Sequence, residues 1–466
     1  MRHALYILGY LSSGLVLAVL AGAGRAGADE PPGSGPAEPP GFWERDTLTG
    51  DWGGARARLA DWGVALGAVY SGETMANVSG GLRRGAVYAG QLKVSADLDL
   101  ARLASWDGAT IHADAFQIHG RGLTAEFLGN LLVTSNIEAH PATRLYTAWF
   151  QQSLFEDRVS IRAGQIAADD EFVISDTAMT FHNGTFAWLP HTASNLPSGG
   201  PGYPLATPGA RIAVTPVEDL TVLTAVFSGD PAGKPGAEDP QIHNDSGTTF
   251  SLDGGALLMA EIQYALNRGG QGLPGTYKVG GWYHTGKFDD FRTDDTGLSL
   301  ADPATSGVPV RHRGNHGIYA IADQMVYREE GSEDRGLNLF MRVGGAPSDR
   351  NLIEFYADGG LGYKGLIPGR EEDVLAVGYG FAEISHDLQG FDSDSRAFSG
   401  ANTPVHDHEA VLEFTYICQI APWWSVHPDL QLLFNPGGNV ANPNDPSGLT
   451  VVPDAVVVGL RTVVAF

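Results

Sequence analysis

Candidate binding residues gather in one long segment, residues 167–207. Three adjacent acids open it, Asp169, Asp170 and Glu171, and Trp188 follows. Carboxylates accept hydrogen bonds from hydroxyl groups, and an indole presents a flat apolar face that suits the C–H surface of a sugar ring. The segment is therefore a candidate site for a small sugar. A solvated turn, or a Ca²⁺ ion held by the clustered carboxylates, is the alternative interpretation of the acidic triplet.

A second set of candidates lies along segments in which polar and apolar residues alternate. In a β-strand such polar residues all point to one face. A lining that carries both positive and negative charges suits a neutral solute. Alternatively, these side chains could only solvate that face or pair with one another. Two arginines are added because the predicted long loop 71–86 that carries them could reach inward. The set comprises Arg83, Arg84, Lys93, Asp97, Arg162, Glu409 and Glu413.

Motifs for catalysis are absent or out of context. The chain has no HExxH and no G-x-S-x-G sequence. Gly360 to Gly365 matches G-x-G-x-x-G, but the turn Pro368-Gly369 follows where a dinucleotide site needs a helix. The sequence therefore predicts neither an enzyme nor a bound cofactor, although two separated acids could in principle serve glycoside hydrolysis.

The first 28 residues have the features of a cleaved secretory signal peptide. A basic start at Arg2 is followed by an apolar run from Leu5 to Ala23 and an Ala-x-Ala ending at Ala28. A membrane anchor is the alternative, and the Pro-rich stretch 29–40 favours cleavage. No other segment approaches the roughly 20 apolar residues that a membrane helix needs. A second crossing of a membrane would therefore require a closed barrel, which leaves no strand edge in lipid.

The composition fits an exported, β-rich protein. The chain carries 54 acidic and 29 basic residues, and its formal net charge of −25 argues against a nucleic-acid partner. The single cysteine, Cys418, cannot form an internal disulfide, so a large closed sheet is the expected source of stability. The 62 glycines and 9% aromatic residues indicate many turns and strands.

From Val64 onward the sequence alternates with a period of two, after a short helix expected within 55–62. Residues 88–100 are the clearest case, because Tyr88, Leu92 and Val94 share one face while Lys93 and Asp97 share the other. Sixteen strands of this kind are predicted, at 64–70, 87–100, 109–118, 144–152, 158–166, 208–214, 219–227, 256–266, 276–284, 316–327, 336–344, 353–364, 374–384, 409–420, 424–434 and 456–466.

The predicted connections alternate in length. Those after even-numbered strands are short and those after odd-numbered strands are mostly long, with 345–352 as the exception. Outer-membrane barrels sort their loops in this way, with short periplasmic turns and long external loops. A secreted sugar-binding β-sandwich would also alternate, but it needs neither sorted loops nor the terminal aromatic Phe466. The pattern therefore favours an all-β, transmembrane, antiparallel up-and-down β-barrel.

Several blocks of the sequence resemble the carbohydrate-selective porins of Gram-negative bacteria, the OprB-type family. The resemblance covers nearly all of the mature chain, and it is specific because the blocks occur together. They are Leu48 to Leu59 (LTGDWGGARARL), Gly164 to Phe172 (GQIAADDEF), Gly360 to Leu375 (GLGYKGLIPGREEDVL), Glu413 to Tyr416 with Ala421 to Gln431 (APWWSVHPDLQ), Asn435 to Gly438, and Gly459 to Phe466 (GLRTVVAF).

The resemblance implies a sixteen-stranded outer-membrane barrel that passes small sugars such as glucose by diffusion. We expect a signal peptide at 1–28, a periplasmic linker and short helix at 29–63, and the barrel at 64–466. The loop 167–207 is expected to fold inward and narrow a water-filled lumen. Outer-membrane lipid and lipopolysaccharide are the expected surroundings, and a homotrimer is a further expectation. A general channel, or one for another solute, is the alternative.

Overall fold

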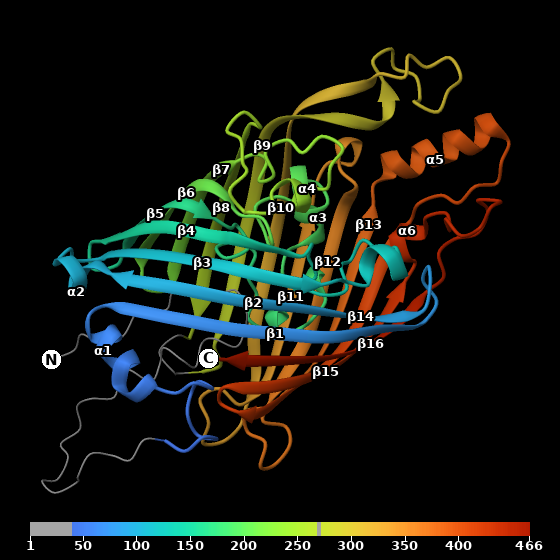
Figure 1. Ribbon diagram of the computed structural model, residues 1–466. Helices are drawn as coiled ribbons and strands as arrows, with labels where there is room; N and C mark the ends of the chain where they lie inside the picture. Colours follow the sequence, from blue (N-terminus) through green and yellow to red (C-terminus); the bar gives the residue numbers. More distant parts are fainter. Residues whose placement is uncertain (1–39, 268–271) are drawn as a thin grey trace, which may run out of the picture.

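Sixteen antiparallel strands close into one barrel in the computed structural model, which describes residues 40–267 and 272–466 (Figure 1). The first eight are β1 (Val64–Ser79), β2 (Gly85–Asp99), β3 (Ala109–Gly120), β4 (Ala142–Leu154), β5 (Val159–Ile166), β6 (Thr207–Val217), β7 (Leu220–Ser228) and β8 (Ala256–Leu266). The others are β9 (Gly275–Asp294), β10 (Pro309–Arg328), β11 (Gly336–Gly345), β12 (Ile353–Lys364), β13 (Val374–Ile384), β14 (His408–Ala421), β15 (Trp424–Phe434) and β16 (Ala455–Ala465).

Helices are short and lie in the connections. The α-helices are α1 (Ala55–Asp61), α2 (Leu100–Ala104), α3 (Pro190–Ala193), α4 (Pro240–His243), α5 (His386–Ser399) and α6 (Pro436–Asn439). The remaining helical turns are η2 (Trp52–Gly54), η3 (Thr124–Leu128), η4 (Ala178–Thr180), η5 (Gly184–Phe186), η6 (Pro197–Gly199) and η7 (Ser348–Arg350). Within the described residues no helix is long and apolar enough to cross a membrane.

The sixteen predicted strands are confirmed, and β8, β12, β13 and β15 have the predicted bounds. The largest differences are in three strands, because β1 continues to Ser79, β9 continues to Asp294 and β10 begins at Pro309. The predictions of long loops at 71–86 and 285–315 were therefore wrong. The outer parts of β9 and β10 project beyond the barrel as a hairpin (Figure 1). Strands that face water on both sides do not alternate clearly, which explains the residues missed in β9 and β10.

The barrel closes where β1 pairs with β16. Val69 lies opposite Ala465 and Glu73 lies opposite Arg461 in this antiparallel seam. Every other strand pairs with its neighbours in sequence. Closure leaves no unpaired strand edge, which is the condition for a sheet to sit in lipid.

The two faces of the barrel differ as the alternation predicted. On β2, Tyr88 and Val94 are 45% and 44% exposed on the outer surface, whereas the Lys93 side chain lies inside against Asp114. Other large apolar side chains are exposed in the same way, among them Ile318 and Leu460. An apolar outer band around a polar interior is the arrangement of a membrane barrel.

The connections are sorted to the two ends of the barrel. Short turns and α1 lie at the end shown at the left of Figure 1, and the long connections, including the one that carries α5, lie at the other end. Residues 80–84 and 346–352 are short connections on the long-loop side. The first is a second exception to the predicted rule, because β1 is longer than expected.

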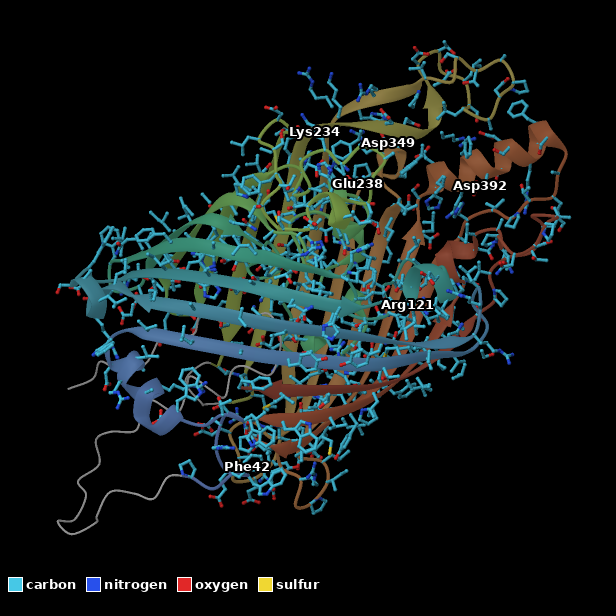
Figure 2. All side chains as sticks on the ribbon, in the orientation of Figure 1. Phe42, Arg121, Lys234, Glu238, Asp349 and Asp392 are labelled. Carbon is cyan, nitrogen blue, oxygen red and sulfur yellow. The ribbon has the colours of Figure 1, made fainter. Side chains whose placement is uncertain are left out.

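The N-terminal segment packs against the short-turn end beside the closing seam. Arg56 donates from Nη2 to the carbonyl oxygen of Phe466 at 2.8 Å. Trp423 donates from Nε1 to the carbonyl oxygen of Phe42 at 3.0 Å (Figure 2). Trp423 is thereby buried rather than exposed at a membrane interface, whereas Tyr283 and Tyr327 are exposed on the outer face. The predicted signal peptide lies outside the described residues.

Candidate functional site

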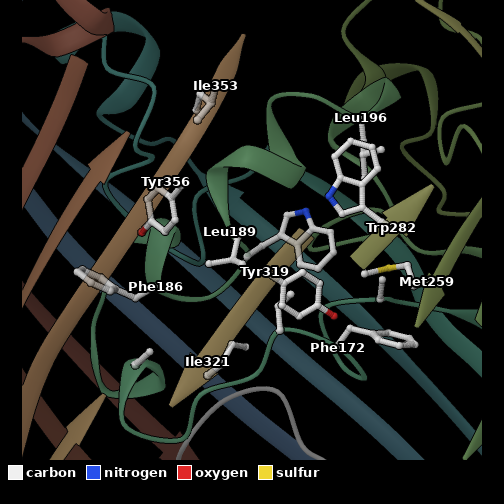
Figure 3. Packing of buried hydrophobic residues seen from close by; sticks show 14 of the residues in the cluster. Phe172, Phe186, Leu189, Leu196, Met259, Trp282, Tyr319, Ile321, Ile353 and Tyr356 are labelled. Atoms are coloured by element: carbon white, nitrogen blue, oxygen red, sulfur yellow. The ribbon is translucent and has the colours of Figure 1, made fainter. Parts of the chain in front are cut away.

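Two long connections fold into the barrel and fill part of its lumen. They are residues 121–141, between β3 and β4, and residues 167–206, between β5 and β6. Apolar residues of the second, including Phe172, Phe186 and Leu189, pack against wall residues such as Trp282 and Tyr356 (Figure 3). We refer to 121–141 and 167–206 as the inward loops. The sequence predicted only the second of them.

Carboxylates on the barrel wall hold the backbone of both inward loops. Glu409 accepts the N–H groups of Leu131 and Leu132, with its closest oxygens at 2.8 and 2.7 Å. Glu413 accepts those of His182 and Asn183 at 2.5 and 3.0 Å. Irregular backbone inside a protein carries donors that no helix or sheet satisfies, and a carboxylate can accept several of them. These two wall residues therefore act as anchors.

Two further carboxylates on the barrel wall hold the second inward loop in the same way. Glu261 accepts the N–H of Val173 at 3.0 Å. Asp323 accepts the hydroxyl of Ser175 at 2.8 Å and the N–H of Thr177 at 3.3 Å. These bonds place the start of the second inward loop against β8 and β10.

Arg342 supplies the complementary contact to loop carbonyl groups. It forms a fully buried ion pair with Asp358, in which Nε lies 3.0 Å from Oδ1. Its Nη2 donates to the carbonyl oxygen of Thr185 at 3.0 Å. The Asp358 carboxylate is further held by the hydroxyl of Tyr356 at 2.8 Å. Each charge of this buried pair thus has further hydrogen-bond partners, as burial requires.

The base of the second inward loop is fixed by a buried cluster of charges. Glu171 pairs with Arg162, and Nε of Arg211 lies 2.8 Å from its other oxygen. Gln151 accepts from Nη2 of Arg162 at 2.9 Å and from Nη2 of Arg211 at 3.0 Å. The Arg162 guanidinium also lies 3.6 Å from the ring centre of Trp149. The cluster ties the loop to β4, β5 and β6.

The open space lies on the opposite side of the lumen. A cavity of about 160 Å³ runs between the inward loops and the wall formed by β1–β4 and β14–β16. The second inward loop packs mainly against β7–β13, whereas the first packs against β1, β2, β15 and β16. Its principal polar and aromatic lining residues are Gln91, Lys93, Phe116, Asn136, Tyr146, Asp169, His182, Tyr203, His427 and Arg461.

Both cations that line the cavity are neutralised by wall acids. Lys93 Nζ lies 2.8 Å from Oδ2 of Asp114. Arg461 Nη2 lies 2.7 Å from Oε2 of Glu73 and 3.2 Å from the hydroxyl of Ser135 in the first inward loop. The side chains still offer N–H and O–H groups, but the local charge is balanced.

Asp169 is the acid of the predicted triplet that lines the cavity. It accepts the Tyr146 hydroxyl at 2.9 Å and the Tyr203 N–H at 2.7 Å. Loss of hydration raises its pKa, and the adjacent Asp170 acts in the same direction. A shift of this sign reduces the negative charge that a solute meets at this point of the passage.

Two histidines of the second inward loop stay neutral for the same physical reason. Burial lowers the pKa of His191 to about 3, and the nearby Arg342 adds to the effect. Burial also holds the pKa of His182 well below its usual value, with Arg461 and His427 contributing. The loop therefore adds little charge of its own near the cavity.

The predicted site residues fall into three groups. Lys93 and Asp169 line the cavity, and their contact with a solute stays a prediction. Arg162, Glu409 and Glu413 on the wall face groups of the inward loops, and Glu171 of the second loop faces the wall residues Arg162 and Arg211. No more than 6% of each of the four predicted residues is exposed. The expectation that they contact a solute in an open lumen was wrong, because they are buried between the loops and the wall.

The other predicted residues lie away from the cavity. Trp188 is buried within the loop and donates to the carbonyl oxygen of Gly199 at 3.1 Å. Arg83 and Arg84 are exposed in the turn 80–84, where Arg83 pairs with Glu126. Asp97 accepts from His112 Nδ1 at 2.7 Å. Asp170 adjoins Asp169 but does not line the cavity.

Several lining residues were missed as site candidates. Tyr146, Tyr203 and Phe116 form one aromatic cluster, with Phe116 and Tyr146 ring centres 4.8 Å apart. Their residue types alone could not show whether these side chains line a cavity or only pack in a core. The inward fold of 121–141 had a visible signal, because Phe127, Leu128, Leu131 and Leu132 make this predicted surface loop unusually apolar.

The acidic triplet does not converge on a common point for a cation. Two arginines engage Glu171, while Asp169 accepts from Tyr146 and Tyr203. The Ca²⁺ alternative for this triplet therefore finds no support in the geometry.

Comparison with known proteins agrees with the fold. The family model described as carbohydrate-selective porin, OprB family, matches residues 83–466. Porin B of Pseudomonas aeruginosa is 24% identical over 439 residues, which cover 90% of this chain and 91% of that protein. A putative porin, QuiX, of Acinetobacter baylyi is 24% identical over 450 residues, with coverages of 90% and 93%. The high-pH structure of Pseudomonas putida OprB superposes with a TM-score of 0.80 at 25% identity, covering 92% of this chain and 100% of that one.

Proposed function

The chain belongs to the OprB family of carbohydrate-selective porins, and we propose that uncharged sugars cross it through the passage between the inward loops and the wall formed by β1–β4 and β14–β16. It is an outer-membrane porin for sugars, and the family consists of channels rather than enzymes. The finer proposal concerns which solutes pass and which residues they meet. Transport is diffusion along a gradient through hydrated space.

The balanced charge of the cavity carries this proposal. Lys93 and Arg461 are each paired with a wall acid, so neither is a free cation for an anionic solute. A charged solute would have to give up hydration without gaining an unpaired partner. A sugar loses less hydration free energy, because its hydroxyls exchange hydrogen bonds with water for hydrogen bonds to the lining groups. The rings of Phe116 and Tyr146 suit its C–H faces.

Size-matched solutes provide the test. Liposomes that contain the refolded protein should admit glucose faster than gluconate, which differs mainly by its carboxylate. Equal rates in the wild-type protein would overturn the proposal in favour of a general channel. Blockade of single-channel current by millimolar glucose or maltose would show direct contact with the passage.

A variant of Glu73, compared with a matched control, tests whether the ion pair at the β1–β16 seam causes the selectivity. Replacing Glu73 with Gln frees the charge of Arg461, so gluconate should enter faster relative to glucose. The control is Asp253→Asn, because Asp253 lies exposed in the external connection 229–255. An unchanged ratio in Glu73→Gln would exclude the paired cation as the source of discrimination.

The surroundings of the barrel follow from its outer face. We propose that outer-membrane lipid and lipopolysaccharide cover the exposed apolar band, in which Leu460 and Ile318 are 54% and 70% exposed. A homotrimer remains a prediction, and native mass spectrometry of the detergent-solubilised protein tests it.

A further inference from the structure

Three metal-ligating side chains converge at the external end of the barrel. Asp290 belongs to β9, His312 to β10 and Asp349 to η7. One ligand atom of each lies within 4.8 Å of the others, and the described residues, 40–267 with 272–466, hold no second group of this kind. His312 Nε2 is 2.8 Å from Oδ2 of Asp290 and 3.5 Å from Oδ2 of Asp349. One imidazole nitrogen thus faces two carboxylates from separate chain segments.

Neighbouring groups orient both carboxylates. Oδ1 of Asp290 accepts the N–H groups of Arg292 and Thr293 at 2.8 and 2.7 Å, which leaves Oδ2 directed at the histidine. Asp349 is held by Arg350, whose Nε and Nη2 each lie 2.7 Å from one of its oxygens. A carboxylate has about four lone-pair sites, so this bidentate contact leaves acceptor capacity on Oδ2. Outer hydrogen bonds that fix ligand orientation are typical of metal sites.

The charge of the group also favours a cation. With a neutral imidazole, Asp290 and Asp349 bring two negative charges near one point and Arg350 compensates one of them. Asp290 is only 9% exposed. A single N–H of His312 can serve one carboxylate at a time, whereas a divalent ion can bind both together with the imidazole nitrogen.

The distances suit a small divalent ion. Zn–N and Zn–O bonds are about 2.0–2.2 Å long, so two ligands of a tetrahedral ion lie roughly 3.4 Å apart. The spacing of 3.5 Å between His312 and Asp349 already matches, and the spacing of 2.8 Å to Asp290 must open slightly. Imidazole suits zinc far better than calcium or magnesium, which prefer oxygen ligands alone.

We propose that Asp290, His312 and Asp349 bind one Zn²⁺ ion, with water completing the coordination. The site joins the projecting β9–β10 hairpin to η7 in the connection 346–352. Helix α5 meets the same hairpin through Arg292 and Asp394, with Nε to Oδ2 at 2.9 Å. Asp349 and Asp392 mark this region, beside α5, in Figure 2. A bound ion fixes the hairpin at the external mouth and lies apart from the sugar passage.

Zinc titration of the full-length, refolded protein in detergent tests the site. The protein has 14 histidines, so stoichiometry must be compared between matched variants. His312→Asn and Asp290→Asn should each lose one equivalent of Zn²⁺ relative to wild type. In Asp290→Asn the amide oxygen can still accept the two backbone N–H groups, so the turn is preserved. His386→Asn is the control, because in the described part of the chain His386 contacts only Glu354 among the acids within ion-pair distance.

Co²⁺ offers an independent readout, because its visible absorption reports coordination by nitrogen and oxygen ligands. The wild-type protein and His386→Asn should develop the same absorption, and His312→Asn should lack it. Barrel folding is checked by the migration of unheated samples in gels. The proposal is overturned if folded His312→Asn binds as many equivalents as wild type, or if the wild-type protein shows no saturable zinc binding.

Discussion

Removing the Glu413 carboxylate should loosen the second inward loop without opening the barrel. In the wild-type protein this side chain accepts two loop N–H groups, from His182 and Asn183. Leaving a buried donor unsatisfied costs about 1–3 kcal/mol, so Glu413→Ala, which leaves two loop N–H groups unpaired, removes about 2–6 kcal/mol of local stabilisation. Even the lower figure raises the population of the released segment about thirtyfold, since about 1.4 kcal/mol corresponds to a factor of ten.

Single-channel recording in a planar bilayer measures this release. The segment that contains His182 borders the cavity, so its motion should increase open-channel noise and weaken blockade by glucose. Glu413→Gln keeps one acceptor oxygen but loses the charge, so its effect should be smaller than that of alanine. The other contacts of the loop, at Glu261, Asp323 and Arg342, should keep it inside the barrel.

The matched control is Glu354→Ala. Glu354 is also a wall carboxylate, but it accepts the N–H of His386 in an external connection rather than an inward loop. Its removal should leave noise and glucose blockade unchanged. If folded Glu413→Ala matches wild type in conductance, noise and blockade, the assignment of this carboxylate as a loop anchor is wrong.

Three further outcomes follow from the contacts of the inward loops. Arg342→Met leaves Asp358 buried without its cation, which should destabilise the packed loop by about 3–5 kcal/mol; amide exchange at 173–185 should accelerate, and unchanged exchange would contradict the role of the pair. The pKa of His191 is lowered from 6.5 to about 3, so its stabilising effect is present above about pH 6.5 and is lost as pH falls toward 3; exchange in 167–206 should accelerate over that window, and His191→Leu should reduce the change and leave the part that the buried His182 contributes. Burial raises the pKa of Glu138 from 4.5 to about 7, so the first inward loop should be most protected below about pH 4.5 and less protected as pH rises through 7; Glu138→Gln should remove this dependence, and its persistence would point to another group.

The barrel was predictable because its signal repeats along the sequence. Alternation such as Lys93 inside and Val94 outside recurs in strand after strand, and sorted connections give the orientation. Alternation fails where lipid no longer covers one face, so the outer parts of β9 and β10 were missed. The even number of alternating strands predicted a closed antiparallel barrel, in which β1 pairs with β16.

The site was less predictable because its contacts join distant parts of the chain. Glu413 and Lys93 look alike from sequence, as polar residues on the inner face of a strand. One meets backbone N–H groups from a loop more than 200 residues away, and the other borders open space. Local pattern identifies the face of a residue but does not identify its partner across the lumen.

The anchors also explain why a sugar channel of this kind needs so many inward-facing acids. An irregular loop packed inside a barrel presents backbone N–H groups in a place where water is partly excluded, and each unpaired donor would be costly. Wall carboxylates such as Glu409 and Glu261 satisfy these donors, while the loop covers the carboxylates and prevents them from attracting cations. On the proposed function, selectivity for an uncharged solute follows from the same contacts that hold the constriction in place. For this reason, neutralising an anchor should alter sugar recognition through the position of the loop, whereas neutralising Glu73 should alter it through the unpaired charge of Arg461.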